Sequence, residues 1–157
     1  MAHKKSHRWG VKLWVLSEAD TGYTWRVHVY KGRAGARALP GQGVGYRAVT
    51  NLVQPILNRG HHVTTDSFFT SPQLAHYLWT QRTYLTGTIN PARKGLPRRL
   101  QRIHPQQNEL VMRNQEQVLV VKTRHNREVT WLSTYAGARL LSNIKIRNIL
   151  TVSYCPF

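Results

Sequence analysis

The carboxylates are the first place to look for chemistry, because the chain holds only six among its 157 residues. Glu18 and Asp20 lie in a short polar stretch before a glycine, where carboxylates are ordinarily solvated turn residues. Three others share polar surroundings and are expected at the surface: Glu109, Glu116 and Glu128. Asp66 differs from these five because it follows a run with the composition of a β-strand.

Asp66 ends the run of residues 61–65, and a helix start follows at Ser71 and Pro72. The carboxyl end of a strand in a mixed sheet is a common position for a functional group. On position alone, however, the simpler interpretation is that Asp66 caps a turn. His61 and His62 lie close by in the sequence, but on a strand they would point to opposite faces and could not share one metal ion without distortion.

Other chemistries have little support in the residues. Gly41, Gly43 and Gly45 precede a helical pattern but lack the full motif of a phosphate-binding or dinucleotide-binding loop. Ser67 has no credible base nearby in the sequence, so nucleophilic catalysis is unsupported. Cys155 is the single cysteine, which excludes an internal disulfide and a thiolate zinc site.

The charge balance points to a polyanionic partner. The chain has 23 Lys and Arg residues against 6 Asp and Glu, a formal net charge of +17. Such a surface favours nucleic acid, because each neutralised phosphate releases condensed counterions. An anionic membrane surface is the weaker candidate, and a ribosomal or other RNA-binding protein stays open. Neighbours such as Trp25 and Arg26 could stack on bases, although Trp14 and Trp25 more simply cover a sheet.

The same features indicate where the protein works. No apolar run reaches the length of a membrane span, and residues 1–8 lack the apolar stretch of a signal peptide. A single cysteine suits a reducing compartment. We therefore expect a soluble intracellular protein without a membrane partner or a small-molecule substrate. The basic residues 3–8 could serve as a nuclear-import patch.

Periodicity predicts a mixed sheet flanked by helices. The strands are expected at residues 9–16 and 23–30 as a hairpin, then at 61–65, 84–89, 118–121 and 129–132. Helices are expected at residues 46–57, shortened or kinked by Pro55, and at 71–82. Residues 90–105 read as an exposed basic connection. This order of elements indicates the α/β class, with an α+β mixed sheet.

Three stretches in register resemble the piggyBac transposase family over roughly residues 7–136. The first covers residues 7–14 and 20–23, the second 43–60 and 65–72, and the third 87–88, 93–97 and 131–134. The resemblance implies an RNase H-like core with extra antiparallel strands, and a DDE/DDD cut-and-paste DNA transposase. In that chemistry three carboxylates hold two divalent ions, Mg²⁺ or Mn²⁺, because two dications require anions to offset their repulsion. Asp66 then matches the second catalytic aspartate and would be a metal ligand.

The departures from the family are as informative as the match. The family's first aspartate lies just upstream of residues 9–12, but residues 1–7 contain no carboxylate; its third lies downstream of 132–134, but residues 137–157 contain none. We therefore expect residues 1–136 to be a partial RNase H-like catalytic domain without its first strand, and residues 137–157 to be an unmatched tail. The chain alone would then bind metal unproductively, lack transposase activity and retain general DNA affinity in the nucleus. The alternative is a domesticated, non-catalytic protein that binds DNA or a transposase partner.

A folding consequence follows from the same resemblance. In an RNase H-like sheet the strand with the first aspartate lies centrally, between the second and fourth strands. Its loss would expose two apolar strand edges. We therefore expect marginal stability, pairing with another copy or with a full-length transposase, or a rearranged sheet.

Overall fold

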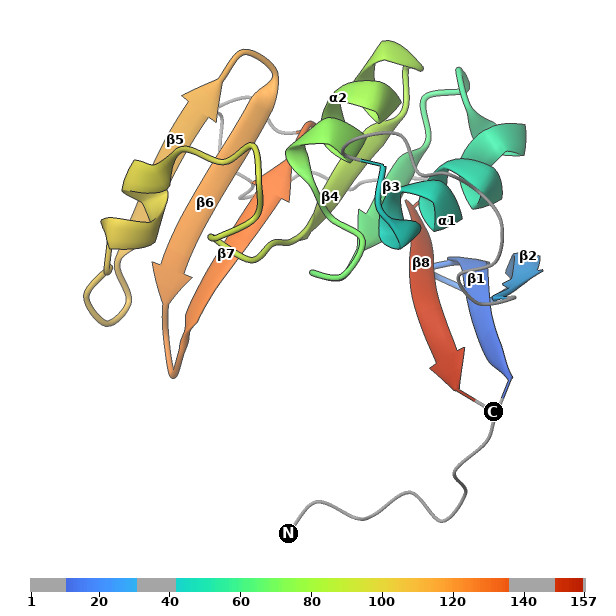
Figure 1. Cartoon of the computed structure of the whole chain (residues 1–157), viewed down its shortest axis with the longest axis horizontal. Coiled ribbons are helices and arrows are strands. Elements are labelled where there is room, and N and C mark those ends of the chain that lie inside the picture. The colour runs from blue at the N-terminus through green and yellow to red at the C-terminus, as the bar shows by residue number, and fades with distance from the viewer. Residues whose placement is uncertain (1–10, 31–41, 136–148, 157) are drawn as a thin grey trace, which may run out of the picture.

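The computed structural model describes residues 11–30, 42–135 and 149–156 of the chain. In these ranges a mixed eight-stranded sheet carries two α-helices and two short 3₁₀-helices (Figure 1). The strands are β1 (Lys12–Glu18), β2 (Thr24–Val29), β3 (His62–Thr65), β4 (Tyr84–Thr88), β5 (Leu110–Gln115), β6 (Val118–Arg124), β7 (Glu128–Ser133) and β8 (Ile149–Pro156). The helices are α1 (Val44–Val53), η1 (Gln54–Ile56), α2 (Pro72–Thr80) and η2 (Arg98–Arg102). The mixed α/β class expected from the sequence is confirmed.

The two helices begin and end where their residues dictate. Ser71 caps α2 by accepting a hydrogen bond from the Leu74 amide at 3.2 Å, and Pro72 occupies the first turn, where its missing N–H costs nothing. Pro55 cannot continue α1, so the chain tightens into η1 at that point. Both helices expected from the sequence are confirmed, with α1 shortened as predicted.

The strand order is β2-β1-β8-β3-β4-β7-β6-β5. β3 runs parallel to β4 and to β8, and the other neighbouring pairs are antiparallel. The β1–β2 hairpin and the β6–β7 pair are confirmed. β5 and η2 were missed: β5 is an edge strand without a continuous buried face, and η2 lies in the connection whose prolines and arginines read as irregular.

The centre of the sheet is completed by β8, which the sequence did not predict. β8 pairs antiparallel with β1, where Leu16 faces Val152, and parallel with β3, where Thr65 faces the same Val152. The two edges expected to be open are therefore paired by a later segment of the same chain. Of the outcomes expected for those edges, a rearranged sheet is the one observed. The strand lies within residues 137–157, so that segment shares the sheet with the residues before 136.

One face of the sheet carries both helices and the core (Figure 1). The strands contribute Trp14, Leu16, Val63, Leu85, Leu132 and Val152 to this core. Each fully buried aliphatic side chain contributes about 1.5–3 kcal/mol. Trp14 is buried at 2% exposure as expected, but Trp25 is 50% exposed, because β2 is an edge strand and the core lies on its other face. None of the helices in the described ranges is long and apolar enough to span a membrane.

Thr151 gives a direct test of the dependence on β8, because it pairs with Ser17 on one side and Thr64 on the other. We expect Thr151→Pro to lower the free energy of unfolding by about 3 kcal/mol or more, since proline removes a ladder donor from a strand paired on both edges. Thr151→Val keeps the backbone N–H and the β-branched shape and should stay close to the parent. Urea denaturation followed by circular dichroism measures both, and equal stability of the two variants would show that β8 is not integral to the sheet.

Candidate functional site

Asp66 lies directly after β3 and forms a tight turn with the residues that follow it. Its Oδ1 accepts a hydrogen bond from the Phe68 amide at 2.9 Å. Its backbone carbonyl accepts from the Phe69 amide at 3.2 Å and the Thr70 amide at 3.0 Å. The side chain is exposed. The carboxylate therefore caps a turn, which was the simpler interpretation of its position, and it still has oxygen lone pairs that face solvent.

The turn at residues 66–70 is anchored from both sides. On the core side the Thr65 and Thr70 hydroxyls are hydrogen-bonded at 2.7 Å, and Thr70 also donates to the Asp66 carbonyl at 2.7 Å. On the outer side the Arg93 guanidinium donates to the carbonyl oxygens of Ser67 and Phe68. These hydrogen bonds hold the turn that carries Asp66 in one place.

Two glycines allow the turn to pack against the rest of the fold. A Cβ on Gly87 in β4 would overlap the Thr65 carbonyl oxygen and the Thr70 hydroxyl. A Cβ on Gly45, in the first turn of α1, would lie 2.9 Å from the Phe68 carbonyl oxygen. Both contacts involve backbone atoms that cannot move aside cheaply. Gly45 and Gly87 are therefore the positions that set the distances from α1 and β4 to Asp66.

The two carboxylates of the β1–β2 hairpin, Glu18 and Asp20, lie at and just beyond the C-terminal end of β1. Glu18 pairs with Leu150, and Leu150 pairs with Val63, three residues before Asp66. The Glu18 carboxylate instead accepts a hydrogen bond from Thr21 in the hairpin loop. Asp20 lies in the same loop and is exposed. Neither carboxylate is placed to share an ion with Asp66.

Glu128 and Glu109, two carboxylates of the second half of the chain, are bound by other side chains and amides. Glu128 forms an ion pair with the buried Lys122 at 3.0 Å and a hydrogen bond with His104 at 3.0 Å. The hydrogen bonds from His104 and Lys122 lower the pKa of Glu128, so it is ionised at neutral pH. Glu109 accepts from the Gln106 amide at 2.6 Å. Across residues 11–30, 42–135 and 149–156 no three His, Cys, Asp or Glu side chains come together as a metal site.

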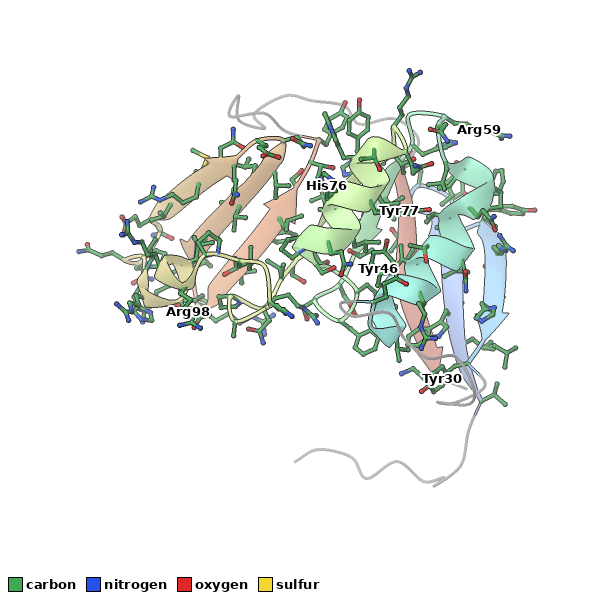
Figure 2. All side chains as sticks on the ribbon, turned by 45° about the horizontal axis from the view of Figure 1, so that its top comes forward. Tyr30, Tyr46, Arg59, His76, Tyr77 and Arg98 are labelled. Atoms are coloured by element: carbon green, nitrogen blue, oxygen red, sulfur yellow. The ribbon has the colours of Figure 1, made fainter. Side chains whose placement is uncertain are left out.

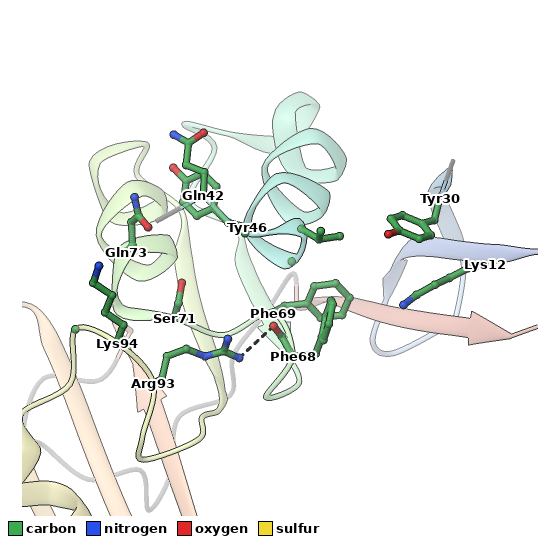
Figure 3. A pocket seen from close by; sticks show the side chains of 14 residues that line it. Lys12, Tyr30, Gln42, Tyr46, Phe68, Phe69, Ser71, Gln73, Arg93 and Lys94 are labelled. Carbon is green, nitrogen blue, oxygen red and sulfur yellow. Dashed lines mark hydrogen bonds between the residues drawn. The ribbon is translucent and has the colours of Figure 1, made fainter. Parts of the chain in front are cut away.

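A basic pocket of about 1070 Å³ opens beside the Asp66 turn (Figure 3). Its walls come from the start of β1, the end of β2, the first turns of α1 and α2, and the loop at residues 93–95. Three of its lining residues are cations: Lys12, Arg93 and Lys94. None of the six carboxylates, all of which lie in the described ranges, lines it. The arrangement suits an anion.

Aromatic rings line this pocket or pack against rings that line it. Phe68 stacks on Trp14 with ring centroids 5.6 Å apart and planes at 20°, and it is 48% exposed. The Lys12 ammonium lies 4.3 Å from the Trp14 ring centroid and 5.2 Å from that of Phe68. Tyr46 and Tyr77 meet between α1 and α2 at 5.8 Å (Figure 2), and burial, then Tyr77, raises the pKa of Tyr46, so its phenol is neutral at pH 7.

The site residues around Asp66 were not all visible in the sequence. Arg93 and Lys94 belong to a stretch that carries the family resemblance, so they could have been proposed. Lys12 and Phe68 were quoted only as members of motifs, and nothing in the sequence placed them against one another. That juxtaposition depends on the pairing of β1 with β8 and of β8 with β3.

Comparison with known proteins identifies the family. The family described as Transposase IS4 matches residues 1–152 of this chain. The chain belongs to the IS4-type transposase family. The match runs through residue 152, so it includes much of the segment that the sequence left unmatched.

The fold of this IS4-type transposase chain has a solved counterpart. It is similar to the piggyBac transposase in a cryo-EM synaptic complex with hairpin DNA, with a TM-score of 0.72 and 22% sequence identity. The alignment covers 90% of this chain and 30% of the length of that transposase. The resemblance to a piggyBac-like transposase is therefore confirmed, and the shared fold is that of the piggyBac structure.

A buried histidine lies on the sheet face opposite the helices of this IS4-type chain. His62 Nε2 is hydrogen-bonded to the Thr86 hydroxyl at 2.8 Å, and Thr86 to the Ser133 hydroxyl at 2.7 Å. Its ring stacks on Tyr135 at 5.0 Å. Burial lowers the pKa of His62 to about 4, so the ring is neutral in the folded protein at pH 7.

Gly87→Ala tests the close approach of β4 to the Asp66 turn. We expect it to lower the free energy of unfolding by about 3 kcal/mol, because the new methyl group overlaps the Thr65 backbone. Gly43→Ala is the matched control, since a Cβ at Gly43 meets nothing within 4 Å. That variant should lose no more than about 1 kcal/mol, through the poorer N-cap of α1. Chemical denaturation of both variants measures the difference, and equal losses would contradict the packing.

His62 predicts an acid-sensitive stability. Its folded pKa of about 4 lies below the ordinary 6.5, so its contribution is fully present above pH 6.5 and is lost as pH falls towards 4. We expect the free energy of unfolding to decline across that range more steeply than in His62→Gln, which cannot titrate. Urea melts of both proteins at several pH values provide the comparison. Parallel pH profiles would mean that His62 is not buried as a neutral ring.

Proposed function

We propose that this chain is a DNA-binding part of a cut-and-paste transposase core and that it has no strand-cleaving activity by itself. Family membership supports the transposase origin, and the net charge of +17 supports a nucleic-acid partner. The matched piggyBac transposase is seen in a synaptic complex with hairpin DNA. A chain with the same fold is expected to bind DNA on the corresponding surface.

The observation that carries the proposal is that a basic pocket lies next to a single carboxylate, Asp66. Lys12, Arg93 and Lys94 surround a recess next to Asp66. These cations can neutralise backbone phosphates. DNA is therefore expected to pass over this end of the sheet, beside the turn at residues 66–70.

The metal chemistry of the family does not fit the residues described. DDE transposases generally use divalent metal ions, and Asp66 is the residue that would hold one here. Two-metal chemistry needs several carboxylates to offset the charge of the ions. No three His, Cys, Asp or Glu side chains of the described residues come together around a metal position, and Glu18 and Glu128 are bonded to Thr21 and Lys122 instead. The Mg²⁺ or Mn²⁺ expected from the resemblance would therefore not be bound productively by these residues.

The same isolation of Asp66 favours a second candidate, a domesticated protein that binds DNA or a transposase partner without chemistry. Both candidates predict DNA affinity, and both are compatible with a nuclear location through the basic residues 3–8. They share a transposase origin and differ in whether the chain contributes to cleavage when other parts of a transposase are present. Restoration of cleavage when this chain is mixed with other parts of a transposase would favour the first.

Nicking of supercoiled plasmid by the purified full chain tests the proposal. We expect DNA binding that weakens steeply with salt, and no nicking in Mg²⁺ or Mn²⁺ above a no-protein control. Asp66→Asn is the informative variant, because asparagine Oδ1 can still accept from the Phe68 amide and preserve the turn. Metal-dependent nicking that disappears in Asp66→Asn would overturn the expected inactivity. Absence of any DNA affinity would overturn the proposed binding.

A further inference from the structure

We propose that the basic pocket binds an unpaired nucleotide, with its phosphate at the first turn of α1 and its base on Phe68. The inference rests on the proposed DNA-binding function and gives it a substrate class, namely DNA with a single-stranded end or an extruded base. It is carried by the cavity, by the cations that converge on it and by the exposed aromatic ring.

The phosphate end of the pocket is built from backbone amides and cations. α1 begins with Gly43 as its N-cap, and no side chain within the described ranges caps it; the Arg47 amide makes the first intrahelical bond, to the Gly43 carbonyl. Gly43, Val44 and Gly45 line the pocket, so the positive end of the helix faces it. The absence of a Cβ on Gly45 lets this end of α1 pack closely against the Phe68 backbone, beside the aromatic ring.

Two cations, Arg93 and Lys94, line the pocket across from the first turn of α1 (Figure 3). Lys94 is exposed and free to reorient. Arg93 is fixed by its hydrogen bonds to the Ser67 and Phe68 carbonyls, and its buried Nε has no hydrogen-bond partner among the described residues. The Arg93 guanidinium is therefore held beside the pocket, where its positive charge attracts a phosphate.

The base end of the pocket is an aromatic platform. Trp14 packs against Phe68 and holds its ring in place, while about half of the Phe68 surface stays exposed. The Lys12 ammonium lies close to both rings. Base stacking on an aromatic side chain is tolerant of sequence and is a recurring device in single-strand binding.

The shape of the pocket favours an unpaired nucleotide over a duplex. A volume of about 1070 Å³ matches recesses that enclose small-molecule ligands. Inside a duplex both faces of each base are covered by its neighbours, so an internal base can reach a ring in a recess only when it is unpaired or extruded. Duplex backbone contacts would remain at the rim of the pocket.

The test compares two DNA probes on the full chain by fluorescence anisotropy: a blunt duplex, and the same duplex with a short thymidine overhang. We expect the overhang to raise affinity about tenfold, the scale of one stacked base. The measured quantity is the ratio of the two affinities. Phe68→Leu should bring the ratio close to one, because leucine fills the space without a stacking face.

One lysine variant and one arginine variant distinguish binding in the pocket from general electrostatic attraction to DNA. Lys94→Gln and Arg98→Gln each remove one exposed cation, but Arg98 lies in η2 outside this pocket, at the far side of the molecule from Tyr30 (Figure 2). Both should weaken binding to the blunt duplex to a similar extent. The ratio should fall in Lys94→Gln and stay at the parental value in Arg98→Gln.

Titration with thymidine monophosphate, followed by amide NMR shifts, tests the pocket independently of duplex binding. Saturable shifts at Val44 and Gly45 that are lost in Phe68→Leu would support it. A parental affinity ratio of one, or a ratio unaffected by Phe68→Leu, would overturn the pocket and leave the proposed function standing if the duplex still binds. If no DNA binds, the proposed function fails, and the monophosphate titration alone decides whether the pocket takes a nucleotide.

Discussion

A strand in the middle of a sheet must find hydrogen-bond partners on both edges, and the pairing of β8 with β1 and β3 meets this requirement. Without β8, the β1–β2 hairpin would make no backbone hydrogen bonds to the rest of the sheet, since β1 pairs only with β2 and β8. The core would divide at the same place, because Val152 lies between Leu16 and Thr65. The position of Lys12 and Trp14 relative to Asp66 therefore depends on backbone bonds made by residues more than eighty positions downstream of Asp66.

Close backbone contacts then position the turn at residues 66–70 relative to β4 and α1. The turn after β3 is fixed by Thr70 and Arg93, and it meets β4 at Gly87 and α1 at Gly45. Because these contacts leave no room for a side chain, the first turn of α1 is brought beside Phe68. A recess lined by helix amides, cations and rings results from packing that also buries the core. The same residues thus serve stability and the proposed recognition of DNA.

The charges of the chain favour binding of a polyanion over binding of divalent metal ions. Its excess of cations over carboxylates gives a surface suited to phosphate, and the pocket beside Asp66 concentrates that character. Three of the six carboxylates, Glu18, Glu128 and Glu109, are held by Thr21, Lys122 and the Gln106 amide. An IS4-type transposase chain with this distribution can attract DNA far more readily than it can hold two divalent ions.

The sequence by itself indicated the family through three motif stretches in register. It determined the α/β class and the local elements through short-range patterns: alternation in β1 and β2, the Ser71 cap and Pro55. It also isolated Asp66 at a strand end. Only the tertiary structure decided which distant segments meet. β8 was invisible because a central strand is selected by its partners and not by its own periodicity, and β5 because an edge strand needs no buried face. The pocket escaped for the same reason, since Lys12, Phe68 and Arg93 come together through long-range backbone pairing that no local pattern encodes.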